Sequence, residues 1–200
     1  MNVVRNLILA MIFLLFSSSS VFAETWDFGI GLPFYSGRMG NIFPLQLEMG
    51  VASVKGYGIS SSVQSTKVHT VSGFTGKLKL TSYDFHLFYR IEKYVHRWDV
   101  GVTTNLNEYF GKINKTKFSK DVTYIGPMVQ YSTTIKGYDR DEVYYGIRVF
   151  ALSTSEINTS SFDLADDSTF QSENKNYKNF IKDNNPALTI GLNLTIGFRL

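Results

Sequence analysis

Three side chains near the middle of the chain have the chemical types of a hydrolase relay. Ser82, Asp84 and His86 alternate along one extended segment, so all three would project from the same face of a strand. A hydroxyl nucleophile, an imidazole base and an orienting carboxylate must be in hydrogen-bond contact. Residues two apart on a strand lie side by side, about 6.5–7 Å apart, which is too far for that relay. We therefore predict no catalytic site.

Other candidate sites are weaker still. His69 and Ser72 do not have the spacing of a recognised catalytic pair, although a lipid-modifying enzyme remains the second hypothesis. The chain has three His and no Cys, so we expect no metal site, and we expect no cofactor. Gly29 and Gly31 fall inside an expected strand, whereas a phosphate-binding loop requires a turn from strand to helix.

Charged residues on the small and polar face of the expected strands should oppose one another. Arg90 and Asp99 flank one short turn, and Asp27 and Arg199 lie on the first and last segments. Buried charges need partners, so we predict a structural polar network in the interior. The alternative is a narrow polar conduit. The expected members are Asp27, Glu48, Asp84, Arg90, Asp99, Arg148 and Arg199.

A second charged group is basic and falls in an expected connection, residues 111–121. Its lysines are Lys112, Lys115, Lys117 and Lys120. Such a loop could contact the phosphates of lipopolysaccharide or another anionic surface. The alternative is a solvated loop with no ligand.

The elements that would carry these residues are strands. Apolar residues recur with period two in segments of about ten residues, and Val, Ile, Tyr, Phe and Thr suit a pleated surface. The last segment is the clearest, since every second residue from Leu188 to Leu200 is apolar. The eight expected strands are 25–33, 44–53, 56–66, 77–91, 97–110, 122–135, 143–153 and 187–200.

Connections between these segments alternate in length, which is typical of an antiparallel up-and-down transmembrane β-barrel. The longest connection is 154–186, which we expect to be mobile or functional and extracellular. Leu78 and Leu80 are out of phase with the rest of their strand, so we expect a bulge near Thr81. Pro127 cannot donate to a ladder and predicts a bulge or a rim position.

The N-terminus predicts export. Arg5 precedes an apolar run, Leu7 to Phe16, and Val21 and Ala23 have the small-residue spacing of a signal-peptidase site. We expect residues 1–23 to be a cleaved signal peptide and residues 24–200 one all-β domain. Without Arg5 the net charge falls from +3 to +2, which is too low to favour nucleic-acid binding. No later apolar run is long enough for a transmembrane helix.

Together these features resemble the small outer-membrane barrels of the OmpX-like and OmpA-anchor class. The segment 192–200 resembles the terminal signal of that class, which usually ends in an aromatic residue; here Leu200 ends it and Phe198 lies two residues earlier. The resemblance implies an outer-membrane location, contact with membrane lipid and lipopolysaccharide, and recognition of the last strand by the barrel-assembly machinery. Our leading hypothesis is a non-enzymatic surface protein that presents loops. The alternatives are the lipid-modifying enzyme, a narrow channel and a soluble periplasmic ligand-binding barrel.

Overall fold

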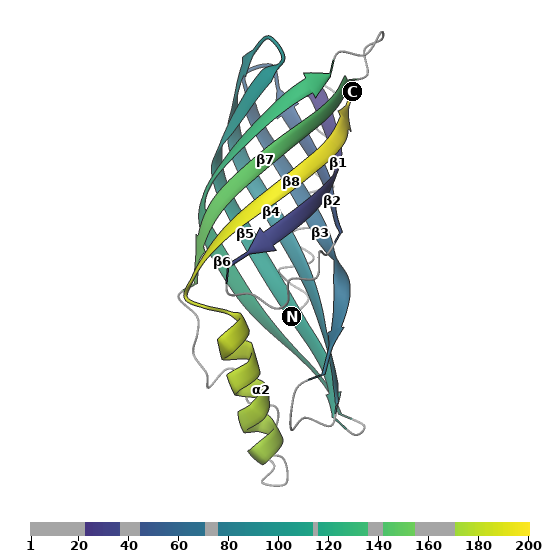
Figure 1. The fold of residues 1–200 in the computed structure, drawn as a ribbon, viewed down its shortest axis with the longest axis vertical. Coiled ribbons are helices and arrows are strands. Elements are labelled where there is room, and N and C mark those ends of the chain that lie inside the picture. The colour runs from purple at the N-terminus through teal and green to yellow at the C-terminus, as the bar shows by residue number, and fades with distance from the viewer. Residues whose placement is uncertain (1–22, 37–44, 71–75, 114–115, 136–141, 155–170) are drawn as a thin grey trace.

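Eight antiparallel strands, paired in chain order, close into a barrel in the computed structural model (Figure 1). The structure describes residues 23–36, 45–70, 76–113, 116–135, 142–154 and 171–200. The strands are β1 (Ala23–Tyr35), β2 (Gln46–Ser53), β3 (Tyr57–His69), β4 (Lys77–Lys93), β5 (His96–Ile113), β6 (Thr116–Ile135), β7 (Glu142–Ser153) and β8 (Leu188–Arg199), and a helix, α2 (Gln171–Asn184), lies between β7 and β8. The predicted all-β, antiparallel eight-strand barrel is confirmed.

The barrel closes where the first strand meets the last. The ladder between β1 and β8 runs from the pair Asp27–Arg199 to the pair Tyr35–Gly191. We call the end of the barrel at Asp27 and Arg199 the termini end, and the opposite end, from which α2 projects, the helix end (Figure 1). Nearly all of the predicted signal peptide, residues 1–23, lies outside the described residues, since β1 begins at Ala23. Within the described part of the chain, no helix has the length and apolar character to cross a membrane.

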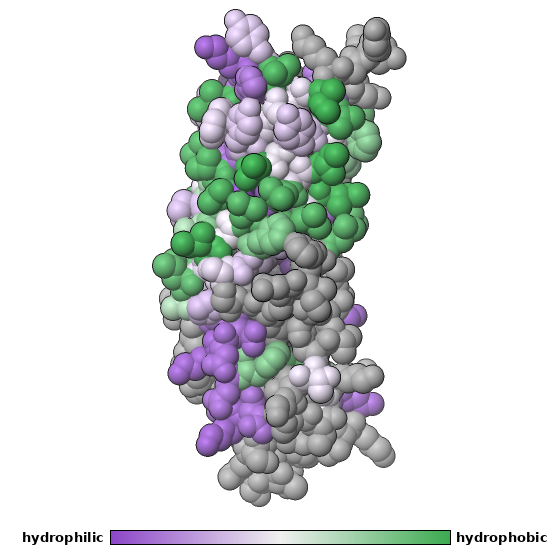
Figure 2. All heavy atoms as spheres, in the orientation of Figure 1, coloured by the Kyte–Doolittle hydropathy of each residue, from purple (hydrophilic) through white to green (hydrophobic). Residues whose placement is uncertain are grey.

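Side chains alternate between the two faces of the barrel wall, most regularly in the last strand. In β8 each residue from Leu188 to Arg199 switches between exposed and buried, with the apolar residues outside. Figure 2 shows the result on the face in view as a band of hydrophobic residues, with hydrophilic residues toward both ends. The polarity is therefore the reverse of that of a water-soluble barrel, as the sequence pattern predicted.

Small residues on the inner face make room for large ones. The Phe150 ring lies over Gly191, where an added Cβ would come within 1.9 Å of the ring, and the Phe88 ring lies over Gly58 in the same way. These glycines fit by lacking a side chain rather than by unusual backbone geometry. Each pair joins neighbouring strands, β7 to β8 and β3 to β4.

A bulge lies where it was expected, opposite Thr81, but its extra residue is on β3 and not on β4. β4 pairs with β5 in one unbroken register, and the irregularity lies opposite, between Gln64 and Lys67 of β3. Leu78 is fully buried because the interior is apolar at the helix end, so its inward direction needs no bulge.

The bulge or rim position expected for Pro127 is wrong. Pro127 pairs with Val102 in the middle of β6, and the register to β5 is kept. On the other side, the ladder to β7 skips Gly126 and Pro127 between the pairs Ile125–Ser153 and Met128–Phe150, without a shift in register. The missing N–H is therefore accommodated by a gap in one ladder.

The predicted long connection at 111–121 is a strand hairpin. β5 continues to Ile113 and β6 begins at Thr116, with pairs down to Ile113–Thr116. The charged composition of this segment suggested a loop. The hydrogen bonds between strands use only backbone atoms, however, so a strand can carry lysine side chains that reach water. These long strands project beyond the rest of the barrel at the helix end (Figure 1).

The predicted long loop 154–186 contains the helix α2, which the sequence pattern did not indicate. Tyr177 and Ile181, four residues apart, form the buried face of α2 and pack against Leu78, Tyr109 and neighbouring side chains in one core cluster. α2 is therefore held in place by packing against apolar residues from several strands. Residues 155–170 of this connection lie outside the described residues.

Candidate functional site

The charged interior of the barrel is the candidate site, and it contains all seven residues expected there. Each of them is at least nine-tenths buried and points inward from its strand. They come from six strands, so the barrel wall, and not any local motif, brings them together. The residues are Asp27, Glu48, Asp84, Arg90, Asp99, Arg148 and Arg199.

A first cluster lies at the termini end. The Arg90 guanidinium donates to Asp99 Oδ1 and Oδ2 at 2.8 and 2.9 Å and to Asp27 Oδ2 at 2.6 Å. Arg199 Nε donates to Asp27 Oδ1 at 2.6 Å. Asp27 thus joins two guanidinium groups, and this cluster links β1, β4, β5 and β8.

The same cluster includes a cation and two acids that the sequence analysis missed. Arg97 is buried and pairs with Glu92 at 2.5 Å and, more distantly, with Glu142 at 3.7 Å. Glu142 also lies 3.8 Å from Arg199. The register could have indicated them, because Glu92 is paired directly with Arg97 and Glu142 directly with Arg199.

A second cluster crosses the middle of the interior. Arg148 on β7 donates to Gln130 Oε1 on β6 at 2.7 Å, lies 2.8 Å from His86 Nε2 on β4, and binds Glu48 on β2. Because a guanidinium has no acceptor, His86 Nε2 must accept this bond, and the ring proton is on Nδ1. Arg148 therefore acts as a strut that connects four strands.

Asp84 is held by neutral donors. Gln46 Nε2 donates to Asp84 Oδ2 at 2.6 Å and Asn105 Nδ2 donates to Asp84 Oδ1 at 2.5 Å, with longer contacts from Ser62 and Tyr35. Amide and hydroxyl donors from several strands replace the solvation that this buried carboxylate loses. Sequence analysis did not identify these donors.

The hydrolase relay gains no support from this geometry. Ser82 Oγ donates to Asn107 Oδ1 at 2.7 Å and accepts from Asn105 at 2.8 Å. His86 Nε2, the atom that a general base would use, is occupied by Arg148. Ser72 lies outside the described residues, and His69 is placed only by its backbone, opposite Leu78. No cluster of three or more His, Cys, Asp or Glu suited to a metal ion occurs in the described ranges.

The expected basic loop is not a loop. Lys112 is on β5 and Lys117 on β6, directly paired, and Lys120 is paired with Tyr109. Lys112 is exposed, Lys120 is half-buried, and Lys115 lies outside the described residues. Three further lysines of this end are on α2, namely Lys175, Lys178 and Lys182, of which the first and last are exposed.

The helix end of the interior is closed by apolar and tyrosine side chains. Asn185 Nδ2 donates to Tyr109 Oη at 2.5 Å, and Tyr124 Oη donates to the Pro186 carbonyl at 3.1 Å, so two tyrosines fix the segment that leads from α2 into β8. Burial, together with the nearby Tyr109, raises the pKa of Tyr177 well above its usual value. This end therefore differs in chemistry from the charged middle.

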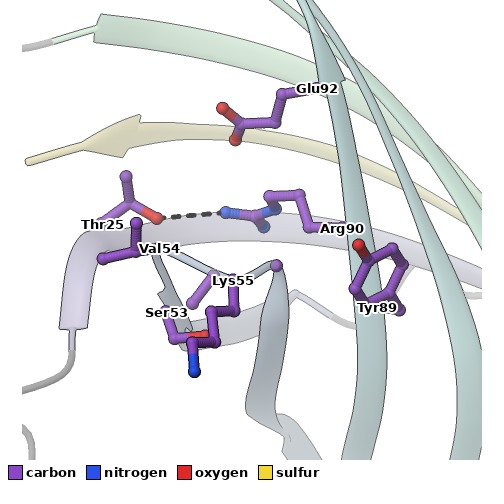
Figure 3. A pocket seen from close by; sticks show the side chains of 9 residues that line it. Thr25, Ser53, Val54, Lys55, Tyr89, Arg90 and Glu92 are labelled. Carbon is purple, nitrogen blue, oxygen red and sulfur yellow. Dashed lines mark hydrogen bonds between the residues drawn. The ribbon is translucent and has the colours of Figure 1, made fainter.

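A small pocket opens at the termini end, beside the β2–β3 turn. It has a volume of about 200 Å³ and is lined by Thr25, Ala52, Ser53, Val54, Lys55, Gly56, Tyr89, Arg90 and Glu92. Figure 3 shows Arg90 directed at Thr25, to which it donates at 3.3 Å. Since Arg90 is already paired with two aspartates, its charge is not available to an anion in this pocket.

Comparison with known proteins gives a likeness of fold. No family model matches the sequence, and no curated protein matches it. Among solved structures, Neisserial surface protein A is 10% identical, with 88% of this chain and 95% of that chain covered and a TM-score of 0.49. The N-terminal β-barrel domain of Pseudomonas aeruginosa OprF is 8% identical over 90% and 99%, with a TM-score of 0.49. The Yersinia pestis attachment invasion locus protein Ail, solved with the heparin analogue sucrose octasulfate, is 9% identical over 89% and 97%, with a TM-score of 0.45. The chain is similar in architecture to these small outer-membrane barrels.

Proposed function

We propose that this protein is a non-enzymatic outer-membrane barrel that presents surface elements on the helix side of the membrane. The observation that carries the proposal is the exposed apolar belt around a charged interior. Outward residues such as Ile190, Ile196 and Leu188 are 57%, 58% and 62% exposed. Water-soluble monomers rarely expose apolar patches of more than a few hundred Å². A hydrocarbon environment removes that cost, which favours the membrane over a soluble periplasmic barrel.

Strand length supports the same assignment. A tilted strand needs about 9–11 residues to cross the hydrocarbon layer. β1 has 13 residues and β8 has 12, whereas β5 and β6, with 18 and 20, are long enough to continue beyond it. The connections at the termini end are short, and the longest connection is at the helix end. The termini end would therefore face the periplasm, and α2 would face outward.

The interior argues for a scaffold rather than a channel or an enzyme. An eight-strand barrel is narrow enough for its own side chains to fill it. Here Arg148 and Arg90 reach across it to acids on other strands, and tyrosines with α2 cover the helix end. Ser82 is bonded to Asn105 and Asn107, and His86 is bonded to Arg148, so these two residues do not form a nucleophile–base pair.

The lysines at the helix end suggest what the surface contacts. Lys112, Lys175 and Lys182 are exposed beyond the apolar belt, where phosphate groups of lipopolysaccharide would lie. We include lipopolysaccharide, together with membrane lipid, among the proposed partners. The last strand, β8, is the proposed contact for the barrel-assembly machinery.

Migration on gels, with and without boiling, of outer membranes from a Gram-negative host that expresses the full chain tests this proposal. Leu194, 40% exposed in the belt, is changed to Arg, which costs about 2–4 kcal/mol near the centre of the bilayer. The matched control is Tyr94→Arg, the same change at a turn residue that is 92% exposed. We expect a heat-shifted band in the membrane fraction for the wild type and for Tyr94→Arg, and its loss for Leu194→Arg.

The result that contradicts the proposal is a wild-type protein found in the soluble periplasmic fraction. Two further measurements separate the alternatives. Ion conductance in planar bilayers at wild-type level would identify a channel, and altered lipid A in expressing cells, abolished by Ser82→Ala or His86→Ala, would identify an enzyme.

A further inference from the structure

Five buried polar atoms in the middle of the barrel have no hydrogen-bond partner among the residues that the structure describes. Each belongs to an inward side chain that is at least nine-tenths buried. They come from β2, β3, β4 and β8. The atoms are Glu48 Oε2, Ser60 Oγ, His86 Nδ1, Asn193 Oδ1 and Thr195 Oγ1.

The five side chains are connected to one residue, Arg148, either by direct contact or through the pairing of the strands. Glu48 and His86 bind Arg148 directly through their other polar atoms. Asn193 is paired with Arg148 in the ladder between β7 and β8, and Thr195 follows two residues later on the same inner face. Ser60 is paired directly with His86. The strand register therefore gathers them in one layer of the interior.

This layer needs a partner that the described side chains do not supply. A buried polar atom without a hydrogen bond loses its hydration and gains nothing in return. Five such atoms together would remove a large part of the small net stability of a folded protein. The hydrogen-bonding capacity of the five atoms defines which donors and acceptors the partner must have. His86 Nδ1 donates, Glu48 Oε2 and Asn193 Oδ1 accept, and both hydroxyls do either.

We propose that this layer is a binding site for a small cluster of internal water molecules. Water donates and accepts, and a buried water usually makes two to four hydrogen bonds to polar groups. An ion fits less well, because Arg148 would repel a cation and Glu48 would repel an anion. A larger ligand would have to displace the Arg148 side chain, which is 2% exposed. The proposal concerns the interior and does not depend on what surrounds the barrel.

Thr195→Val tests the site by the sign of its effect. Valine has the shape of threonine, so the change removes the hydroxyl with little change in packing. If Thr195 Oγ1 binds water, Thr195→Val lowers the thermal midpoint of unfolding in detergent. If the layer is dry, the change removes an unsatisfied group and raises the midpoint. Thr189→Val is the control, since Thr189 Oγ1 donates to the Ser36 carbonyl at 3.2 Å and its loss lowers the midpoint in either case.

A second measurement detects the water itself. Nuclear magnetic resonance of the ¹³C- and ¹⁵N-labelled full-length protein in deuterated detergent should show a cross-peak between the water signal and the Nδ1 proton of His86, absent in His86→Gln. Residues Leu78 and Leu152, which are buried in the apolar core, should show none from their side chains. A higher midpoint for Thr195→Val, or an observed His86 Nδ1 proton without a water cross-peak, overturns the proposal.

Discussion

Arg148 is the residue whose substitution should lower the stability of the barrel most. It is 2% exposed and contacts β2, β4 and β6 from β7, so no other charge can approach Glu48 from the solvent in its place. Arg148→Met retains much of the side-chain volume and removes the guanidinium. The change leaves the Glu48 carboxylate buried without its cation, and it leaves His86 Nε2 and Gln130 Oε1 without their donor.

The expected loss follows from the burial of this pair. Removing one partner of a buried ion pair costs about 3–5 kcal/mol, because the remaining charge stays desolvated. Total stabilities of proteins are about 5–15 kcal/mol, so the change is a large part of the whole. In the unfolding equilibrium it corresponds to roughly two to three and a half orders of magnitude.

Urea unfolding of the refolded protein in phospholipid vesicles measures this loss, with Trp26 and Trp98 as fluorescent reporters. Arg148→Met combined with Glu48→Leu should recover most of the stability, because both charges are then absent. The two single variants and the double variant form a thermodynamic cycle that isolates the pair. If Arg148→Met costs less than about 1 kcal/mol, or if Glu48→Leu restores nothing to it, the strut does not stabilise the barrel in the way described.

Two further predictions concern α2. Ile181→Ala should cost about 2–5 kcal/mol of local stability, since Ile181 is 1% exposed, and hydrogen exchange should rise in 171–184 while strand amides stay protected; equal loss of protection in the strands would contradict separate docking of α2. The raised pKa of Tyr177 means that the folded state keeps the phenol proton above the ordinary pKa of about 10, so the packing of α2 is fully present below that pH and weakens as the pH rises above it. Protease cleavage within α2, followed from pH 8 to pH 11, should show this dependence, and Tyr177→Phe should reduce it; an unchanged profile in Tyr177→Phe would assign the effect to another group.

The sequence predicted the barrel because its signal repeats. Most of the eight segments carry period-two alternation. In β8, the alternate residues from Leu188 to Phe198 are all apolar, so one face of this strand is suited to an apolar environment. The charged pairs Arg90–Asp99 and Asp27–Arg199 could be anticipated from parity and strand order. A short turn restricts the register of the first pair, and closure of the barrel brings the first and last strands of the second pair together.

The contacts across the interior could not be anticipated in this way. Arg148 and Glu48 are 100 residues apart on strands that do not pair, so only the curvature of the closed wall brings them together. The donors to Asp84 have the same origin. The period-two pattern predicts that a side chain points into the barrel. It does not predict which of the other inward side chains that side chain contacts.

The helix end was misjudged because its polarity is the opposite of that of the middle. Leu78 and Tyr109 point inward there, as in a water-soluble protein, and α2 supplies the other half of their core. A pattern that assumed polar interior residues throughout therefore implied a bulge at Thr81. Likewise, Lys112 and Lys117 suggested a loop, although both lie in paired strand.

The position of Asp27 has a consequence for how the chain matures. Its carboxylate is shared by Arg90 and by Arg199, a residue 172 positions away in the sequence. Until β8 pairs with β1, Asp27 has only one of its two guanidinium partners, and the barrel wall is open. Closure of the barrel wall and completion of the ion pairs of Asp27 therefore occur in the same step.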